Sequence, residues 1–396
     1  MTNPGALDGV RVIDAGQIIA GPFAATLLGE FGADVIKVEQ PGIGDASRGA
    51  GGMSPEFAQN SRNKRSITLD LRRPEGQRLF KRLVAVSDVV IENFLPGTME
   101  RWHLGYDDLA AVNAGIVMLR SSGYGQTGPY KHRYSFDRIG MAFAGLTYLT
   151  GMPDHPPVRP GYFIADYGTG FLGAFGVLAA LHHRDGPGNG RGQVVDISLY
   201  ETIWRMSGIL ANDYASTGKV RERLGNTFTG VSPAEQFETA DGQFIVIHAG
   251  SDRTFERLCT TMGDAELAKD PRISGRGGRV KHMEELHQRI RHWVQNLTLA
   301  EALEALDAGG VPASPVNTIA HIFADPQFQA RQNLIHVADP VLGDLVQPGV
   351  TPKLSLTPGG VHSGAPLLGQ HNHEIYRDLL EVGPSEYDEL QRTGVI

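Results

Sequence analysis

Short apolar runs alternate with amphipathic stretches through the first third of the chain. Five such runs predict β-strands, at residues 10–13, 35–38, 66–69, 89–91 and 116–119. The stretches between them, notably 20–31 and 75–86, have the spacing of helices. A strand–helix–strand unit of this kind predicts parallel pairing with a right-handed crossover. The pattern therefore predicts an α/β fold built on an open, mostly parallel sheet.

A long helix rich in glycine and alanine is predicted from Asp166 to about Arg184. Its glycines recur at spacings that let a second backbone pack very close to it, at Gly168, Gly170, Gly173 and Gly176. A strand at 194–197 and a second long helix at about 200–216 follow. These elements extend the α/β pattern to roughly the middle of the chain.

The composition then changes. The pattern predicts a turn, a strand and three helices, at 240–243, 244–248, 252–262, 284–296 and 298–309. We predict from them a small α+β domain at 225–320. Residues 1–218 and 324–396 are predicted to form a large Rossmann-like domain from both chain ends, with linkers at 219–224 and 321–323.

Composition and charge narrow the class of protein. The formal net charge of −8 argues against a nucleic-acid or anionic-membrane partner. The single cysteine, Cys259, excludes an intramolecular disulfide framework. Residues 1–9 contain no charged lead followed by an apolar run, and no stretch reaches the roughly 18 apolar residues of a membrane helix. We therefore expect a cytoplasmic protein.

Motifs for several common functions are absent or out of context. The turn at 16–22 lacks the G-x-G-x-x-G spacing of a dinucleotide site, and the literal match at 123–128 precedes Pro129 and polar residues, which favours a turn-rich loop. Neither a nucleotide-hydrolysing P-loop nor a G-x-S-x-G hydrolase motif occurs. The histidines at 182–183 and 371–373 lack the spacing of a zinc site, so no metal site is predicted.

Asp166 stands at the predicted start of the glycine-rich helix. Its carboxylate there suits an N-cap, which is a structural role. It equally suits a nucleophile, because the helix dipole favours the ionised form and the following glycines clear space for a ligand. The local sequence leaves both interpretations open.

Basic side chains gather at the ends of predicted strands. Lys64 and Arg65 lead into the third strand, Arg72 and Arg73 follow it, and Arg101 comes shortly after Asn93-Phe94. Solvated surface charge explains any one of these cations. Together at the rim of an open sheet, beside an aromatic ring, they suit a phosphate-bearing ligand with a stackable base.

The chain as a whole resembles the class III CoA-transferases, which include formyl-CoA:oxalate and carnitine CoA-transferases. The resemblance rests on motifs that occur in order along nearly the whole chain: LDGVRVID (7–14), AGP (20–22), GADVIKVE (32–39), NKRSI (63–67), ENFLPG (92–97), GYGQTGP (123–129), GRGQ (190–193) and APLLG (365–369).

This resemblance implies a homodimer of two subunits threaded through each other as interlocked rings. It implies an acyl-CoA and a small carboxylic acid as substrates, with coenzyme A and no metal. Asp166 falls on the family's nucleophilic aspartate. The positions implied to contact coenzyme A are Ile18, Ile19, Leu69, Arg72, Asn93, Phe94 and Arg101. Asp137, grouped with them, lies where the family places a polar residue near the active site, and Gln40 stands where some members carry an arginine.

The implied reaction is a ping-pong transfer through an aspartyl anhydride and an aspartyl-CoA thioester, with the acyl groups left open. The alternative within the same fold is an α-methylacyl-CoA racemase or another acyl-CoA isomerase. Those racemases carry a histidine directly before an aspartate, whereas this chain has Phe136 before Asp137, and phenylalanine transfers no proton. A nicotinamide-dependent dehydrogenase and a non-catalytic acyl-CoA-binding protein are the rivals from other classes.

Overall fold

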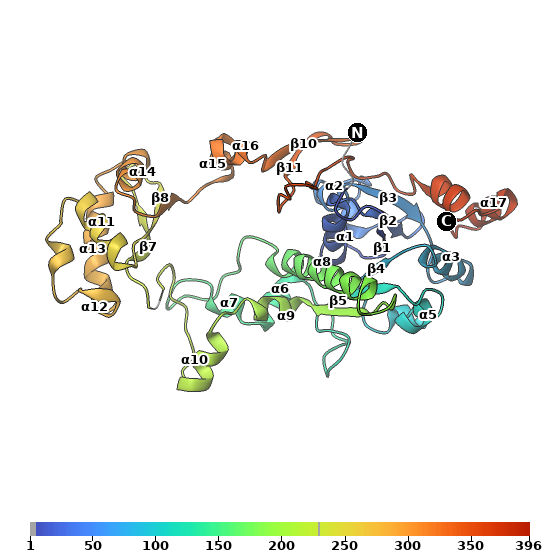
Figure 1. Ribbon diagram of the computed structural model, residues 1–396, viewed down its shortest axis with the longest axis horizontal. Helices are drawn as coiled ribbons and strands as arrows, with labels where there is room; N and C mark the ends of the chain where they lie inside the picture. Colours follow the sequence, from blue (N-terminus) through green and yellow to red (C-terminus); the bar gives the residue numbers. More distant parts are fainter. Residues whose placement is uncertain (1–4, 229) are drawn as a thin grey trace. The chain divides into compact units, whose positions relative to one another are not determined.

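The computed structural model describes residues 5–228 and 230–396 of the chain (Figure 1). It divides into two compact units. The large unit comprises Met1–Thr147, Arg159–Val220 and Gln329–Ile396. The small unit comprises Tyr148–Val158 and Arg221–Phe328.

The large unit is built on a six-stranded sheet in which every neighbouring pair is parallel. Its strands are β1 (Arg11–Asp14), β2 (Asp34–Glu39), β3 (Lys64–Thr68), β4 (Val89–Glu92), β5 (Val117–Ser122) and β6 (Val194–Ser198). The order across the sheet is β3-β2-β1-β4-β5-β6, that of a doubly wound Rossmann fold. The predicted open parallel sheet is confirmed, and its order reverses between β1 and β4.

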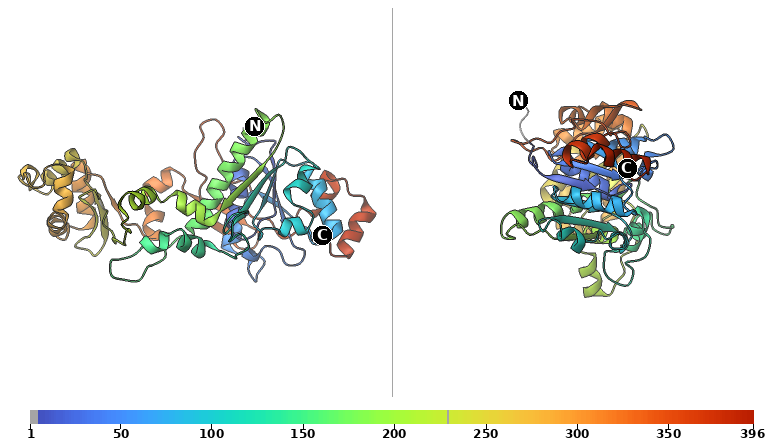
Figure 2. Two further views of the ribbon diagram at one scale, coloured as in Figure 1. Left: turned by 90° about the horizontal axis from the view of Figure 1, so that it is seen from below. Right: turned by 90° about the vertical axis from the view of Figure 1, so that its right-hand side faces the viewer.

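Helices cover both faces of this sheet, because successive strand residues point to opposite sides. On β1, Val12 packs in a core with α1 (Ala20–Glu30) and α8 (Ile164–Asp185). The next residue, Ile13, packs in a second core on the other face. The helices of that second face are α3 (Pro74–Val84), α5 (Tyr106–Ala110) and α17 (Pro384–Arg392). In the left view of Figure 2, the green α8 and the red α17 accordingly lie on opposite sides of the sheet.

Helices α1 and α8 pack most closely at Gly170, one of the four predicted glycines. A Cβ atom added to Gly170 would lie 2.6 Å from Phe23 Cδ1 and 3.2 Å from the carbonyl oxygen of Ala20. One added to Gly173 would lie 2.9 Å from Leu119 of β5. The prediction of close backbone approach is confirmed at Gly170 alone, because Gly168 and Gly176, like Gly173, face side chains of other elements.

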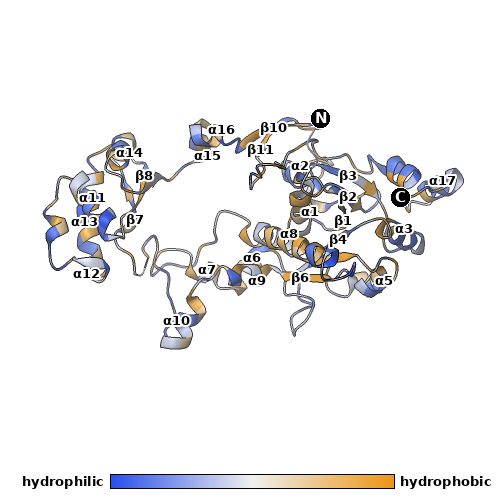
Figure 3. Ribbon diagram, viewed as in Figure 1, coloured by the Kyte–Doolittle hydropathy of each residue, from blue (hydrophilic) through white to orange (hydrophobic). Residues whose placement is uncertain are grey.

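Helix α8 is also the one helix among residues 5–228 and 230–396 that is long and apolar enough to cross a membrane. No such stretch was expected from the sequence. Figure 3 shows α8 coloured mainly as hydrophobic, whereas α17 is largely hydrophilic. Half of the apolar stretch of α8 is buried inside the structure.

The chain after β5 departs from one prediction. The prediction of a single long helix at about 200–216 is wrong, because the structure has two helices there, α9 (Leu199–Arg205) and α10 (Leu210–Thr217). Gly208 between them has a φ of +63°, a left-handed conformation that ends the first helix. The G-x-G-x-x-G match at 123–128 forms turns and bends, with no helix before α6 (Asp137–Phe143), as predicted for a loop.

The C-terminal segment packs against the end of β3. The amide of His371 donates to Ser66 O at 2.9 Å, and the hydroxyl of Tyr376 donates to Thr68 O at 2.7 Å. This segment contains a hairpin of β10 (Leu334–Asp339) and β11 (Gly343–Pro348), and a π-helical turn at Glu374–Leu379. The last residues of the chain thus complete the core of the large unit on its α3 face.

The small unit is an α+β structure with its own core. Its antiparallel sheet has the order β7 (Ala234–Glu238), β8 (Phe244–His248) and β9 (Ala313–Pro315). The helices that pack on the sheet include α11 (Asp252–Thr261), α13 (Met283–Val294) and α14 (Leu299–Ala308). Thr298 and Glu301 form the predicted capping box at the start of α14.

The remaining helices are short. They are α2 (Pro55–Asn60), α4 (Thr98–Arg101), α7 (Leu146–Leu149), α12 (Gly275–Lys281), α15 (Ile319–Ala324), α16 (Pro326–Ala330) and two 3₁₀ turns at Ala46–Arg48 and Leu267–Lys269.

Candidate active site

A cavity of ≈ 340 Å³ opens at the carboxyl edge of the parallel sheet. Its walls come from the loop after β1 (Gln17 to Ala20), the loop after β4 (Asn93 to Pro96) and the end of β5. The strand order reverses between β1 and β4, so the loops that follow these two strands diverge there. Ligands of doubly wound sheets bind in the crevice at such a switch point.

Asp166 lines this cavity. Helix α8 begins at Ile164, so Asp166 occupies its third position, and the N-cap is Phe163. The N-cap interpretation of Asp166 is therefore wrong. Among residues 5–228 and 230–396, none donates a hydrogen bond to its carboxylate oxygens, which leaves them open to the cavity.

The capping role belongs to Asp137 instead. Its Oδ1 accepts hydrogen bonds from the backbone amides of Ala165 at 2.8 Å and Asp166 at 3.2 Å. Asp137 is only 3% exposed, and within the described part of the chain its Oδ2 has no hydrogen-bond partner. Asp137 thus fixes the backbone from which the Asp166 side chain projects, and it places a second carboxyl group beside the first.

Burial raises the pKa of Asp166 to about 7, and the negative charges of Asp137 and Glu56 add to the effect. Burial also raises the pKa of Asp137. The helix dipole was expected to keep Asp166 ionised, but with its pKa at about 7 the carboxyl group is only partly ionised near neutral pH. A carboxylate with a raised pKa is a stronger nucleophile once it is ionised, and perturbed carboxyl groups in a cleft are typical of functional sites.

Most of the predicted site residues meet at this cavity: Ile18, Ile19, Asn93, Phe94 and Asp166 line it, and Asp137 supports Asp166. Asn93 also fixes the facing loop, because its amide group donates to Gln17 O at 2.7 Å and accepts from Gln17 N at 2.8 Å.

Leu69, Arg72 and Arg101 do not line the cavity. Leu69 is buried just after β3. Arg72 is exposed and pairs with Asp70 at 2.8 Å, while Arg101 donates to Thr98 Oγ1 at 2.8 Å. Their contacts with coenzyme A stay predictions.

The segment between β5 and α6 contributes Arg133, which the sequence did not single out, and Phe136. Arg133 lines the cavity and lies over the ring of Tyr130 at 3.8 Å. Arg133 and Asp166 are the charged side chains in the cavity wall. Phe136 lines it as well, so a ring without a titratable proton precedes Asp137 at the site itself. The sequence could have pointed to these residues through their position, because they follow the carboxyl end of β5, where ligands of a parallel sheet bind.

Comparison with known proteins gives a consistent result. The profile of CoA-transferase family III matches residues 7–372. A succinyl-CoA–D-citramalate CoA-transferase from Chloroflexus aurantiacus is 46% identical over 398 residues, covering 99% of this chain and 98% of the relative. The beta subunit of the succinyl-CoA–L-malate CoA-transferase from the same organism is also 46% identical, over 98% of each chain. The crystal structure of a CAIB/BAIF family protein from Brucella suis has a TM-score of 0.83 at 34% identity, covering 96% of this chain and all of that one.

Proposed function

Because the chain belongs to CoA-transferase family III and is a CoA-transferase, we propose that it moves CoA from succinyl-CoA to a second small dicarboxylic acid, with Asp166 as covalent nucleophile. The observation that carries this proposal is the unpartnered carboxylate of Asp166 in a cavity at the switch point of the sheet. The substrate class follows the names of the relatives, which pair succinyl-CoA with a hydroxy-dicarboxylic acid.

The first half of the proposed reaction loads the enzyme. The carboxylate of Asp166 attacks the thioester carbonyl of succinyl-CoA, which forms a mixed anhydride and expels the CoA thiolate. The thiolate then attacks the aspartyl carbonyl of the anhydride. This step leaves an aspartyl-CoA thioester and releases succinate.

The second half reverses these exchanges with the acceptor acid. A carboxylate of the acceptor attacks the aspartyl-CoA thioester, which forms a second anhydride and frees the thiolate again. The thiolate attacks the acceptor's carbonyl in that anhydride, so that the new acyl-CoA leaves and Asp166 is regenerated. One activated acyl bond replaces another in each step, and the charges balance throughout.

Each exchange passes through an oxyanion that needs hydrogen-bond donors. The amides of Gln17 and Ile18 are already engaged by Asn93 and Asp45, and the amide of Tyr167 donates to Phe163 O. The amides of Ile19 and Ala20, at the start of α1, have no acceptor among the described residues. We assign the donor role to these two amides.

The substrate proposal is tested by a transfer assay with purified protein, succinyl-CoA and a panel of acids. We expect new CoA esters of C4 and C5 dicarboxylic acids such as malate, citramalate and glutarate, and rates at least tenfold lower with butyrate of matched length. Equal rates with butyrate would contradict the dicarboxylate proposal. Loss of α-deuterium from a 2-methylacyl-CoA without CoA transfer would favour a racemase. Neither Phe136 nor the names of the relatives favours that activity.

Asp137→Asn is expected to shift the pH dependence of transfer. Transfer requires ionised Asp166, so kcat/KM of the wild-type enzyme should rise with pH and level off above its pKa of about 7. Asparagine keeps an acceptor for the two helix amides but removes the negative charge, so the pKa of Asp166 falls and the rise moves to lower pH.

The matched control for this shift is Asp185→Asn, at the exposed far end of the same helix. It should leave the pH profile where it is in the wild type. An unmoved profile in the Asp137→Asn enzyme would show that the charge of Asp137 does not act on the nucleophile.

A further inference from the structure

The loop between β1 and α1 has a strained backbone at the cavity. Gln17, Ile18 and Ile19 of this loop line the cavity that Asp166 also lines. Ile18 has a φ of +67°, which is a genuine outlier for a β-branched side chain. Such a conformation persists only where the surrounding structure over-determines it.

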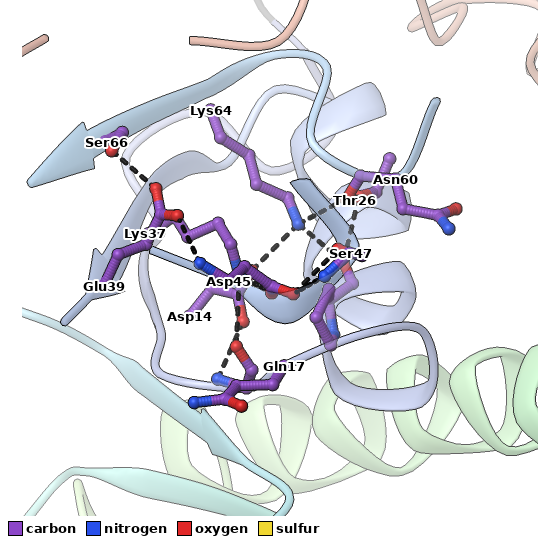
Figure 4. A network of polar contacts seen from close by, with 12 residues as sticks. Asp14, Gln17, Thr26, Lys37, Glu39, Asp45, Ser47, Asn60, Lys64 and Ser66 are labelled. Carbon is purple, nitrogen blue, oxygen red and sulfur yellow. Dashed lines mark hydrogen bonds and ion pairs between the residues drawn. The ribbon is translucent and has the colours of Figure 1, made fainter. Parts of the chain in front are cut away.

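Side chains from other elements hold this loop residue by residue (Figure 4). The amide of Gly16 donates to Asp14 Oδ1 at 3.0 Å, and its carbonyl oxygen accepts from Lys37 Nζ at 3.0 Å. The amide of Ile18 donates to Asp45 Oδ1 at 3.1 Å. Between them, Gln17 is held through its amide and its carbonyl by Asn93, as described above. Three consecutive residues are thus anchored on their backbone atoms.

The charged anchors form one buried network. Lys37 Nζ lies 2.8 Å from Asp45 Oδ2 and 3.6 Å from Asp14 Oδ2, and Lys64 Nζ lies 2.9 Å from the same Asp14 atom. All four side chains are at most 1% exposed. Two cations therefore balance two carboxylates in the dry interior beneath the loop.

Stability alone does not account for this arrangement. Buried ion pairs lose their hydration, and well-packed apolar residues of similar volume are often as stabilising or more so. Apolar residues, however, cannot hold amide and carbonyl groups in a set direction. The charged side chains of Asp14, Lys37 and Asp45 do so through directional hydrogen bonds to the backbone of Gly16 and Ile18.

Asp45 is itself held in place. Its Oδ1 accepts from the amide and hydroxyl of Ser47 at 2.8 and 2.7 Å. Its own amide donates to Glu39, which pairs with Arg48 at 2.7 Å. Burial acts to raise the pKa of Asp45, but the neighbouring Lys37 ammonium outweighs it and the pKa falls to about 2. The carboxylate that anchors Ile18 is therefore ionised across the physiological range.

We propose that Lys37 and Asp45 are positioning residues of the transfer reaction, which hold Ile18 in its left-handed conformation and thereby set the wall of the cavity at Asp166. Neither residue touches the reacting atoms. They act through the 16–19 loop, whose last residue supplies one of the amides assigned to the oxyanion. The expected effect on transfer rests on the proposed function, whereas the restraint on Ile18 rests on the loop geometry alone.

Asp45→Asn tests the proposal in the full chain. An asparagine side chain that faces Lys37 with its amide nitrogen loses that contact, so it cannot keep both the ammonium and the Ile18 amide as partners. We expect kcat to fall at least tenfold while KM for succinyl-CoA changes less than threefold. Thermal unfolding of each variant confirms that it is folded at the assay temperature.

A second substitution separates positioning from a general loss of structure. In the Asp45→Asn background, Ile18→Gly should recover several-fold more kcat than Ile18→Ala, because glycine adopts a positive φ without an external restraint. With Asp45 present, Ile18→Gly and Ile18→Ala should differ less than twofold. Equal kcat values for the two double variants, or wild-type kcat for Asp45→Asn, would overturn the proposal.

Hydrogen exchange of the peptide covering residues 15–20 reads the restraint without any substrate. The amides of Gly16 and Ile18 should exchange at least tenfold faster in Asp45→Asn than in the wild type. Unchanged exchange would overturn the proposal whatever the activity. Faster exchange in a protein that transfers no CoA from succinyl-CoA would instead count against the proposed function, and leave the restraint established.

Discussion

Asp166→Ala is expected to abolish CoA transfer, with kcat lower than in the wild type by at least ~10³-fold. The substitution removes the oxygen that forms the anhydride and the carbonyl that carries CoA, so neither half of the exchange can proceed. CoA affinity should stay within about threefold of the wild type, because the other residues of the cavity wall are unchanged. The measurements are steady-state transfer and calorimetric titration with CoA.

The protein fold is expected to tolerate the loss of the Asp166 carboxylate. The folded-state pKa of Asp166 lies above the usual value of an unfolded aspartate, so its ionised form is disfavoured in the folded protein. That penalty is absent at low pH and grows as the pH rises through 4 to about 7. The unfolding temperature of Asp166→Asn above pH 7 should therefore equal or exceed that of the wild type. Transfer by either variant within tenfold of the wild-type rate would contradict the nucleophilic role.

Lys64→Met is expected to cost the large unit about 3–5 kcal/mol of unfolding free energy, the range for breaking a buried ion pair. Besides Asp14, the Lys64 ammonium donates to the carbonyl oxygens of Pro22 and Asn60, both at 2.7 Å. Methionine fills the space but leaves the buried Asp14 carboxylate without its nearest cation. It also takes one donor from each of the two carbonyl oxygens, which keep Thr26 Oγ1 nearby, at 2.9 Å from Pro22 O and 2.6 Å from Asn60 O. Urea denaturation of the full chain measures the difference.

Arg65→Met is the matched control, one position along the same strand. Arg65 pairs with Asp34 and Glu374, but all three side chains are about a quarter to half exposed. Exposed pairs of this kind contribute at most about 1 kcal/mol. Equal losses for the two variants would show that burial does not set the value of the Lys64 contacts.

The sequence predicted the parallel sheet well, for a physical reason. Strands buried on both faces are mostly apolar runs, and in β4 (Val89–Glu92) three apolar residues precede Glu92, with all four buried. The sequence also predicted helix α8, in which Gly170 lies where the backbone of α1 approaches. The sequence also led to Asp166, although the catalytic assignment came from resemblance to a family rather than from local pattern.

The contacts that shape the site could not be predicted, because they join distant parts of the chain. Asp137 caps α8 from 28 residues away, and Lys64 reaches Asp14 across 50. The first contact determines which residue caps α8, and the second belongs to the network that supports the β1–α1 loop. The N-cap interpretation of Asp166 failed by a shift of three residues in the helix start. Burial, a tertiary property that local sequence does not show, raises the pKa of Asp166 to about 7, so the carboxyl group is only partly ionised near neutral pH.

The covalent role of Asp166 is the central claim, and mass spectrometry of the protein after incubation with succinyl-CoA tests it most directly. We predict a CoA adduct on the peptide that contains Asp166, which disappears on treatment with hydroxylamine and is absent from Asp166→Asn. An adduct that maps to another residue, or rapid transfer with no adduct under any quench condition, would contradict the account.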